Sequence, residues 1–214
     1  MVKHVFLPLL VFLLTATGLD AQQEASPLSP LAAFQERLKK EAASMTSIES
    51  DFVQEKYMDV FQEKILSKGR FYYVQGDRIR MEYTEPVPYL IVINGGKLKV
   101  VSEGKSTVVD LHANRMMQEM KMMVSACMTG DLNRLSGAYQ WEYSETPSLY
   151  VVVIRPLSKS IQAYIHEMTV SLDKRDLSVK TLRLSETAKD YTEYRFTNKK
   201  NNTLASDDET FAIP

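Results

Sequence analysis

The stretch RFYYVQGDRIRMEYTEPVPYLIVINGGKLKVV, residues 70–101, decides the fold class of this chain. Large apolar side chains recur at every second position, as at Ile79, Met81 and Tyr83, which favours strands with one buried face. Gly76-Asp77 and Asn94-Gly95-Gly96 are typical of tight turns between antiparallel strands. The stretch has no histidine, no cysteine and no phosphate loop, so we expect apolar sheet rather than a catalytic motif.

Alternation of apolar and polar residues continues on both sides of this stretch. Gly69 falls inside the preceding strand and predicts a bend or bulge there. Ten or eleven closely spaced strands predict one long antiparallel meander that curls, because large twisted sheets seldom stay open and flat. The expected class is mainly β with two or more helices, and strands begin at residue 48 and cover 65–73, 78–83, 89–93, 97–101, 107–110, 139–144, 149–155, 163–172, 179–185 and 192–197.

Two segments change from a period of two to helical spacing. Ser29-Pro30 has the form of a helix cap followed by proline at the first helical position, which predicts a helix over 30–46. A second helix is predicted over 112–128, ending at Gly130. These two helices are the elements available to cover the concave face of a curled sheet.

The beginning of the chain has the pattern of a secretory leader. A basic start, an apolar run over 5–18 and a small residue before polar sequence predict a leader over 1–21, a linker over 22–28 and one domain over 29–214. Removing the leader takes away one lysine and one aspartate and leaves 25 basic and 26 acidic residues. This near-neutral balance gives no positive electrostatic field that would attract nucleic acid. Cys127 is the only cysteine, so an internal disulfide is excluded.

A reactive centre is not predicted. Cys127 falls on the apolar stripe of the second helix, where a lone cysteine behaves as a small hydrophobe, and His112 lies about four turns away. His166 is expected on the apolar face of the 163–172 strand, either hydrogen-bonded at the wall of a cavity or in the core, or in contact with a ligand head group. Ligand spacing for a metal is missing, and no cofactor is expected. We therefore expect a protein that is not an enzyme.

Methionine is concentrated in the second helix. Residues 116–128 hold six methionines, where the whole chain has 11. Methionine is flexible and polarisable, and it is over-used at surfaces that accept varied apolar partners. The segment is consistent with an ordinary core helix, and equally with a lid whose underside faces a ligand.

Several short motifs, in order, resemble a known family. Ser50-Asp51-Phe52-Val53-Gln54 is similar to an early Ala-Asp-Phe-x-Gln strand, and Gly69-Arg70-Phe71 to a Gly-x-Leu/Phe strand entry. Thr84-Glu85-Pro86 matches a Thr-x-Pro motif, and Val92-Ile93-Asn94-Gly95 resembles a Val-Ser-Asp-Gly hairpin. The residues from Tyr194 to Asn198 and Phe211 to Pro214 look like the final strands. With these motifs the chain resembles the periplasmic outer-membrane lipoprotein carriers, the LolA-like proteins.

This resemblance implies an unclosed antiparallel β-barrel of about eleven strands with a helical lid over an apolar cavity. It implies a periplasmic monomer that takes lipoproteins by their acyl chains from an inner-membrane lipoprotein-releasing transporter and delivers them to an outer-membrane acceptor. The family usually has Arg-Pro after the second strand, where the arginine latches the lid. Here Gln75-Gly76 stand at that place, so the resemblance does not carry this latch over.

Alternation and the resemblance together predict the residues of an acyl-binding cavity. Each sheet residue among them is equally consistent with packing in a filled core. The alternative functions are a periplasmic lipid or glycolipid carrier and an envelope-stress lipid sensor, although sensor relatives are expected to carry a second domain; a periplasmic hydrolase ranks last. The predicted wall comprises Phe52, Phe71, Ile79, Met81, Tyr83, Leu90, Val92, Leu98, Val100, His166 and Met168, and the predicted underside of the lid comprises Met116, Met120 and Met123.

Overall fold

The computed structural model describes residues 29–113, 115–135, 137–205 and 209–213. The predicted leader and linker lie outside these residues. Within the described part of the chain, no helix is long and apolar enough to cross a membrane.

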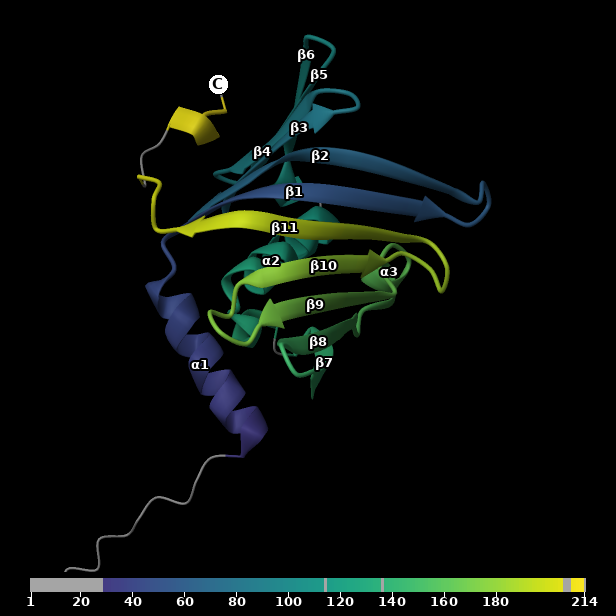
Figure 1. Cartoon of the computed structure of the whole chain (residues 1–214). Helices are drawn as coiled ribbons and strands as arrows, with labels where there is room; N and C mark the ends of the chain where they lie inside the picture. The colour runs from purple at the N-terminus through teal and green to yellow at the C-terminus, as the bar shows by residue number, and fades with distance from the viewer. Residues whose placement is uncertain (1–28, 114, 136, 206–208, 214) are drawn as a thin grey trace, which may run out of the picture.

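Eleven antiparallel strands form one curved sheet with two free edges (Figure 1). Its order is β6-β5-β4-β3-β2-β1-β11-β10-β9-β8-β7. The prediction of one continuous meander is therefore wrong: β1–β6 and β7–β11 are two meanders, joined where the first strand pairs with the last. The strands are β1 (Ser47–Met58), β2 (Glu63–Val74), β3 (Arg78–Glu85), β4 (Tyr89–Asn94), β5 (Lys97–Ser102), β6 (Lys105–Asp110), β7 (Tyr139–Glu145), β8 (Leu149–Pro156), β9 (Glu167–Asp173), β10 (Val179–Ser185) and β11 (Tyr191–Asn201).

The two long helices occupy the predicted positions. Helix α1 (Pro30–Ser44) begins at Ser29, whose hydroxyl accepts a hydrogen bond from the Ala32 amide at 3.2 Å. Helix α2 (Arg115–Thr129) follows the 3-10 turn η1 (Leu111–Ala113) and precedes η2 (Leu132–Leu135). One expectation fails, because a turn and bend after the short helix α3 (Lys159–Gln162) replace the first residues, 163–166, of the predicted 163–172 strand.

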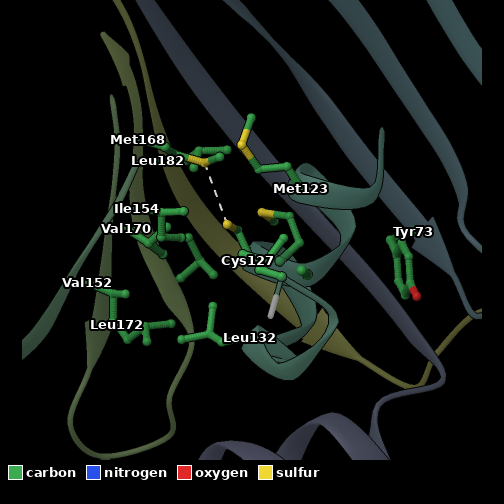
Figure 2. Close-up of a cluster of buried hydrophobic side chains, with 14 of the residues drawn as sticks. Tyr73, Met123, Cys127, Leu132, Val152, Ile154, Met168, Val170, Leu172 and Leu182 are labelled. Atoms are coloured by element: carbon green, nitrogen blue, oxygen red, sulfur yellow. Dashed lines mark hydrogen bonds between the residues drawn. The ribbon is translucent and has the colours of Figure 1, made fainter. Parts of the chain in front are cut away.

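Helix α2 packs against the concave face of the sheet and fills much of it (Figures 1 and 2). Cross-strand pairing places residues of one parity on this face, such as Val152, Val170 and Leu182. Figure 2 shows Cys127 and Met123 of α2 directed into this group. Phe34 and Leu38 of α1 are buried in the same cluster. The core therefore joins both helices to β7–β11 and β1–β3.

A second, smaller cluster lies on the opposite face of β2–β4. The 3-10 turn η3 (Glu209–Phe211) places the Phe211 side chain against Val74 and Val92, where all three are buried. Asn94 Nδ2 donates a hydrogen bond to the Phe211 carbonyl at 3.0 Å. The end of the described chain thus covers the convex face of the strands that carry the candidate site.

Gly69 lies at an irregularity of the β2–β3 pairing, which confirms the predicted bend or bulge, and it also marks a close approach of the two strands. The register of β2 against β3 shifts between Lys68 and Gly69. A Cβ atom at Gly69 would lie 2.1 Å from the Glu82 carbonyl oxygen and 2.7 Å from Phe52 Cζ. Only glycine fits here without displacing backbone, and its small size lets the Phe52 ring lie over the strand.

Asn202 ties the end of α1 to the end of β11, and replacing it is expected to destabilise the fold. Its Oδ1 accepts hydrogen bonds from the Thr46 and Ser47 amides at 2.8 and 3.3 Å, and its Nδ2 donates to the Ser44 carbonyl at 3.0 Å. Its φ of 59° lies in the left-handed region, which alanine tolerates poorly. We expect Asn202→Ala to lower the free energy of unfolding by about 1–2 kcal/mol, measured by urea titration. The exposed neighbour Asn201→Ala is the control, and an equal loss in both variants would contradict this role.

Candidate binding site

An apolar cavity of about 230 Å³ lies between β3–β5 and the underside of α2. Its walls come from alternate residues that the register places on one face: Ile79 pairs with Ile93, Met81 with Ile91, and Ile93 also with Leu98. Lys121 is the one ionisable side chain of the lining. The lining consists of Ile79, Met81, Ile91, Ile93, Leu98, Leu111, Met117, Met120, Lys121 and Val124.

Four of the predicted residues meet at this cavity: Ile79, Met81, Leu98 and Met120. Val100 lies on the same face, since it pairs with Ile91, but it is outside the lining. The backbone of Met116 belongs to α2, and its side chain is outside the described part of the structure.

Five other predicted residues are on the expected face but are buried in the filled core. Phe52 packs edge-on against the Tyr83 ring, with centroids 5.0 Å apart, and Phe71 meets Phe196 in the same way at 5.8 Å. The remaining two, Met123 and Met168, are fully buried. For these positions the packing interpretation holds in the closed structure, so the hollow is confined to the β3–β5 arm.

The assignment of Leu90 and Val92 to the cavity wall is wrong. Val92 is buried on the convex face against Val74 and Phe211, and Leu90 packs at the margin of that cluster. Their neighbours Ile91 and Ile93 line the cavity instead. Residues 90–93 are apolar on both faces because the C-terminal segment covers the outer one, so alternation could not decide which parity points inward.

The prediction for His166 is also wrong. His166 lies in a bend just before β9 and is exposed, as is Tyr164. The helix α3 and its turn take up the residues that would have continued the strand, so the alternation through Met168 and Val170 does not reach back to His166.

Cys127 is buried in the core. Its Sγ lies 3.5 Å from Met168 Sδ, the contact drawn as a dashed line in Figure 2. Burial raises the pKa of the Cys127 thiol to about 12. A thiolate is the reactive form of cysteine, so this residue has the character of a packed hydrophobe rather than a nucleophile.

Three tyrosines, Tyr83 of β3, Tyr89 of β4 and Tyr194 of β11, pack together on the sheet outside the cavity lining. The Tyr83 ring stacks on Tyr89 with centroids 3.9 Å apart, and its hydroxyl lies 3.2 Å from that of Tyr194. Burial raises the pKa of Tyr83 well above its ordinary value. These hydroxyls therefore stay neutral and hydrogen-bond one another, which satisfies polar groups inside an apolar face.

A hydrogen-bonded ion-pair group, which we call the Asp77 latch, joins α2 to the turn between β2 and β3. Asp77 Oδ1 and Oδ2 accept hydrogen bonds from Arg134 of η2 at 2.9 and 2.8 Å, and Oδ1 accepts another from the Ser125 hydroxyl of α2 at 2.8 Å. Lys121 Nζ lies 3.9 Å from Asp77 Oδ2. The hydrogen bonds from Arg134 hold the pKa of Asp77 below its ordinary value of 3.8.

Sequence reasoning missed the Asp77 latch. It identified Gln75-Gly76 at the place of the latch arginine and did not consider an acid there. The nearby Arg80 bonds to Glu82 and the Thr210 carbonyl on the convex face. The available signal was the acid inside the Gly76-Asp77 turn. In the family the latch base is on the sheet, whereas here the acid is on the sheet and the base, Arg134, follows the covering helix.

The two halves of α2 differ in how firmly they are packed. Towards its C-terminus, Met123, Ala126, Cys127 and Met128 are buried in the core. Towards its N-terminus, Met117 and Met120 are half-buried and lie over the cavity. The N-terminal half is therefore the part that covers a hollow rather than a filled core.

A larger hollow of about 580 Å³ lies at the ends of β3 and β4, but it is a wide depression rather than an enclosed space. Its lining includes Arg80, Glu82 and Glu103 beside apolar residues. We assign the candidate site to the smaller cavity, because its lining is apolar apart from Lys121 and it is the less open of the two.

Solved structures with similar architecture share little sequence with this chain. An uncharacterized conserved protein from Thermus thermophilus has 12% identity and a TM-score of 0.51, over 87% of this chain and 95% of that one. A chain of the Pseudomonas aeruginosa MucA/MucB complex has 14% identity and a TM-score of 0.51, over 85% of this chain and 62% of that one. A LolA superfamily protein from Nitrosomonas europaea has 11% identity and a TM-score of 0.46, over 85% and 96%. The first two likenesses show a shared fold.

Among curated proteins, none matches this sequence. The sequence does match a family model, described as outer membrane lipoprotein carrier protein LolA, over residues 43–213. That match spans all eleven strands and the helix over the cavity, and the chain therefore belongs to the LolA family of outer membrane lipoprotein carriers.

Proposed function

We propose that this protein is a periplasmic carrier that holds the acyl chains of lipoproteins in its apolar cavity and shuttles them from the inner to the outer membrane. The observation that carries the proposal is the apolar hollow beneath α2, lined by nine apolar side chains and Lys121. Membership of the LolA family supports a carrier of lipids or lipoproteins. The predicted leader supports export.

The energetics of an acyl chain suit a wall of this kind. Burying such a chain releases about 0.8 kcal/mol per methylene, or about 12 kcal/mol for roughly 16 carbons. A carrier must match most of this energy to remove the chain from a bilayer, and must not greatly exceed it, or the cargo would not leave. Methionines adapt to varied chain positions, so Met81, Met117 and Met120 suit a wall that binds without fixing one geometry.

The closed cavity is too small for a whole acyl chain, so the proposal requires movement of α2. At about 230 Å³ it falls below the roughly 300–1,000 Å³ of typical ligand pockets. The half-buried N-terminal part of α2 is the element whose displacement would enlarge it, and the Asp77 latch would have to yield where it meets α2 at Lys121 and Ser125. We infer that the described state is the closed one.

The partners that this role requires are an inner-membrane transporter that loads the carrier and an outer-membrane acceptor that unloads it. The carrier performs no bond chemistry in this scheme. Its work is transfer of an apolar group between surfaces, which needs an apolar wall and a movable cover and does not need a nucleophile.

Native mass spectrometry of the protein purified from the bacterial envelope tests the proposal. We expect a species heavier than the bare chain by the mass of an acylated protein, lost when the complex is mixed with outer-membrane vesicles. A mass increase equal to a lipid or glycolipid would assign a different cargo. Bare protein that also fails to bind a fluorescent fatty acid would contradict the carrier function.

A further inference from the structure

The hairpin formed by β1 and β2 exposes apolar side chains at its tip. Val60 and Phe61 are 80% and 64% exposed. Near the start of β2, Ile65 and Leu66 are also exposed, at 44% and 55%. Figure 1 shows this hairpin projecting past the ends of the neighbouring strands, at the end of the sheet away from α1. Exposed apolar residues grouped in this way mark an interaction surface, whereas single ones do not.

The turn holds these side chains outward in a defined conformation. The Phe61 and Gln62 amides donate to the carbonyls of Met58 and Asp59 at 3.2 and 3.1 Å. Gln62 adopts a left-handed φ of 54°, and its Nε2 donates to the Asp59 carbonyl at 2.7 Å. Val60 and Phe61 are therefore presented by a hydrogen-bonded turn.

Charged groups behind the tip are paired with one another. Asp59 meets Lys189 at 2.9 Å, Glu55 meets Lys64 at 2.9 Å, and Lys56 lies 3.6 Å from Glu186. Pairing lowers the cost of bringing these groups close to an apolar medium. Glu63 is exposed beside the turn, so the tip carries no excess of positive charge.

An aromatic pair lies behind the apolar tip, among the ion pairs. The Tyr57 and Tyr191 rings stack with centroids 5.6 Å apart. Their hydroxyls bond to Asp59 at 3.4 Å and to Glu55 at 2.7 Å. Behind the apolar apex, tyrosines and paired charged groups lie at about the same level, and both kinds of side chain suit the head-group region of a bilayer.

We propose that the β1–β2 hairpin docks this protein on lipid bilayers by inserting Val60 and Phe61 among the acyl chains, with Tyr57 and Tyr191 at head-group level. A protein partner fits the tip less well. A stable protein interface buries about 800 Å² on each side, while a whole phenylalanine supplies roughly 200 Å². A narrow convex apex meets a fluid medium without needing a matched surface.

The charges at the tip select the kind of bilayer. Paired ions and the exposed Glu63 give no attraction to anionic lipid, so binding rests on the apolar apex. We expect binding to neutral phosphatidylcholine or phosphatidylethanolamine vesicles that hardly changes between low and high salt, since screening acts on unpaired charge. The attachment is reversible, because two inserted side chains fall short of what stable anchoring requires.

Vesicle flotation tests the proposal without any cargo, so the result is independent of the function proposed for the cavity. Every described helix and strand lies after residue 29. The chain is therefore used from Gln22 onward, which removes the apolar run over 5–18 as a competing lipid anchor. We expect the double variant Val60→Ser and Phe61→Ser to lose about tenfold or more of its partition into phosphatidylcholine vesicles at millimolar lipid.

The matched control is the double variant Val87→Ser and Val108→Ser, at two valines elsewhere that are 52% and 46% exposed. The control double variant should bind vesicles as the unaltered chain does. In a third variant, Phe61→Trp, tryptophan emission should shift to the blue on adding vesicles. The proposal is overturned if the unaltered chain does not bind neutral vesicles, or if the serine variant binds them equally well. It is also overturned if hairpin variants impair the delivery of lipoproteins while no form of the chain binds lipid. The last result would assign the hairpin to a protein partner.

Discussion

Glutamate in place of Met81 is expected to weaken the binding of an acyl chain about 100-fold or more while the sheet remains folded. Met81 lines the cavity from β3, and Met120 lines it from α2. A carboxylate there either stays ionised and must be desolvated when the acyl chain enters, or takes up a proton at a cost. In the empty cavity water can solvate it, so the penalty falls on binding rather than on folding. The effect would be measured by titration with a fluorescent fatty acid, and Met120→Glu should behave in the same way.

Two control variants separate the cavity from general damage. Met81→Leu keeps an apolar side chain of similar volume and should bind within a few-fold of the unaltered protein. Val108→Glu adds the same charge on β6, outside the cavity, and should leave binding unchanged. Tight binding by folded Met81→Glu and Met120→Glu variants would show that the acyl chain goes elsewhere.

The sheet was predictable because its strands alternate and its turns have glycine at the positions that need it. Ile79, Met81 and Tyr83 do share the inner face, with turns at Gly76-Asp77 and Asn94-Gly95-Gly96 on either side of the segment. Alternation failed where both faces are covered, as at Leu90 and Val92, because the covering Phe211 is more than 100 residues away in sequence. Local pattern contains no information about a contact of that range.

The sequence could not predict which apolar residues line the cavity and which fill the core, for a related reason. A filled core and a lined cavity use the same residues at the same spacing, and only the path of α2 decides between them. That path brings Met123 into the core and leaves Met120 over the cavity, three residues apart on one helix. The pairing of Asp77 with Arg134 is likewise tertiary, since 57 residues separate them.

Loss of the Asp77 carboxylate is expected to speed the release of a bound acyl chain about 30-fold, because the Asp77 latch holds α2 against the β2–β3 turn. The Asp77 side chain is 19% exposed and that of Arg134 is 33% exposed, so solvent screens this pair less than a surface ion pair. Asp77→Asn keeps the shape but removes the charge and leaves Arg134 without its partner. We expect a loss on the order of 2 kcal/mol from the closed state, measured as faster ligand release and as faster hydrogen exchange in α2. Asp131→Asn, a neighbouring acid with no ion pair among the described residues, removes a charge that acts on Arg134 only from a distance and should have a much smaller effect.

Acid should open the Asp77 latch only well below neutral pH. The folded-state pKa of Asp77 is lowered from 3.8 by Arg134. The stabilisation is therefore fully present above the unfolded-state value of about 3.8 and is lost as pH falls through the lower folded-state value. Release from the unaltered protein should be constant between about pH 5 and 8 and accelerate below about pH 4, whereas the Asp77→Asn variant should lack the part of this acceleration that comes from Asp77.

A charge reversal distinguishes a specific ion pair from general loosening of the lid. Asp77→Arg and Arg134→Asp should each accelerate release, because each places like charges in contact. Combined, they restore the pairing of opposite charges and should recover at least half of the lost closed-state stability, giving a coupling energy of about 1 kcal/mol or more. Single effects that simply add would mean that Asp77 and Arg134 act on α2 separately. The Asp77 latch would then have no part in gating the cavity.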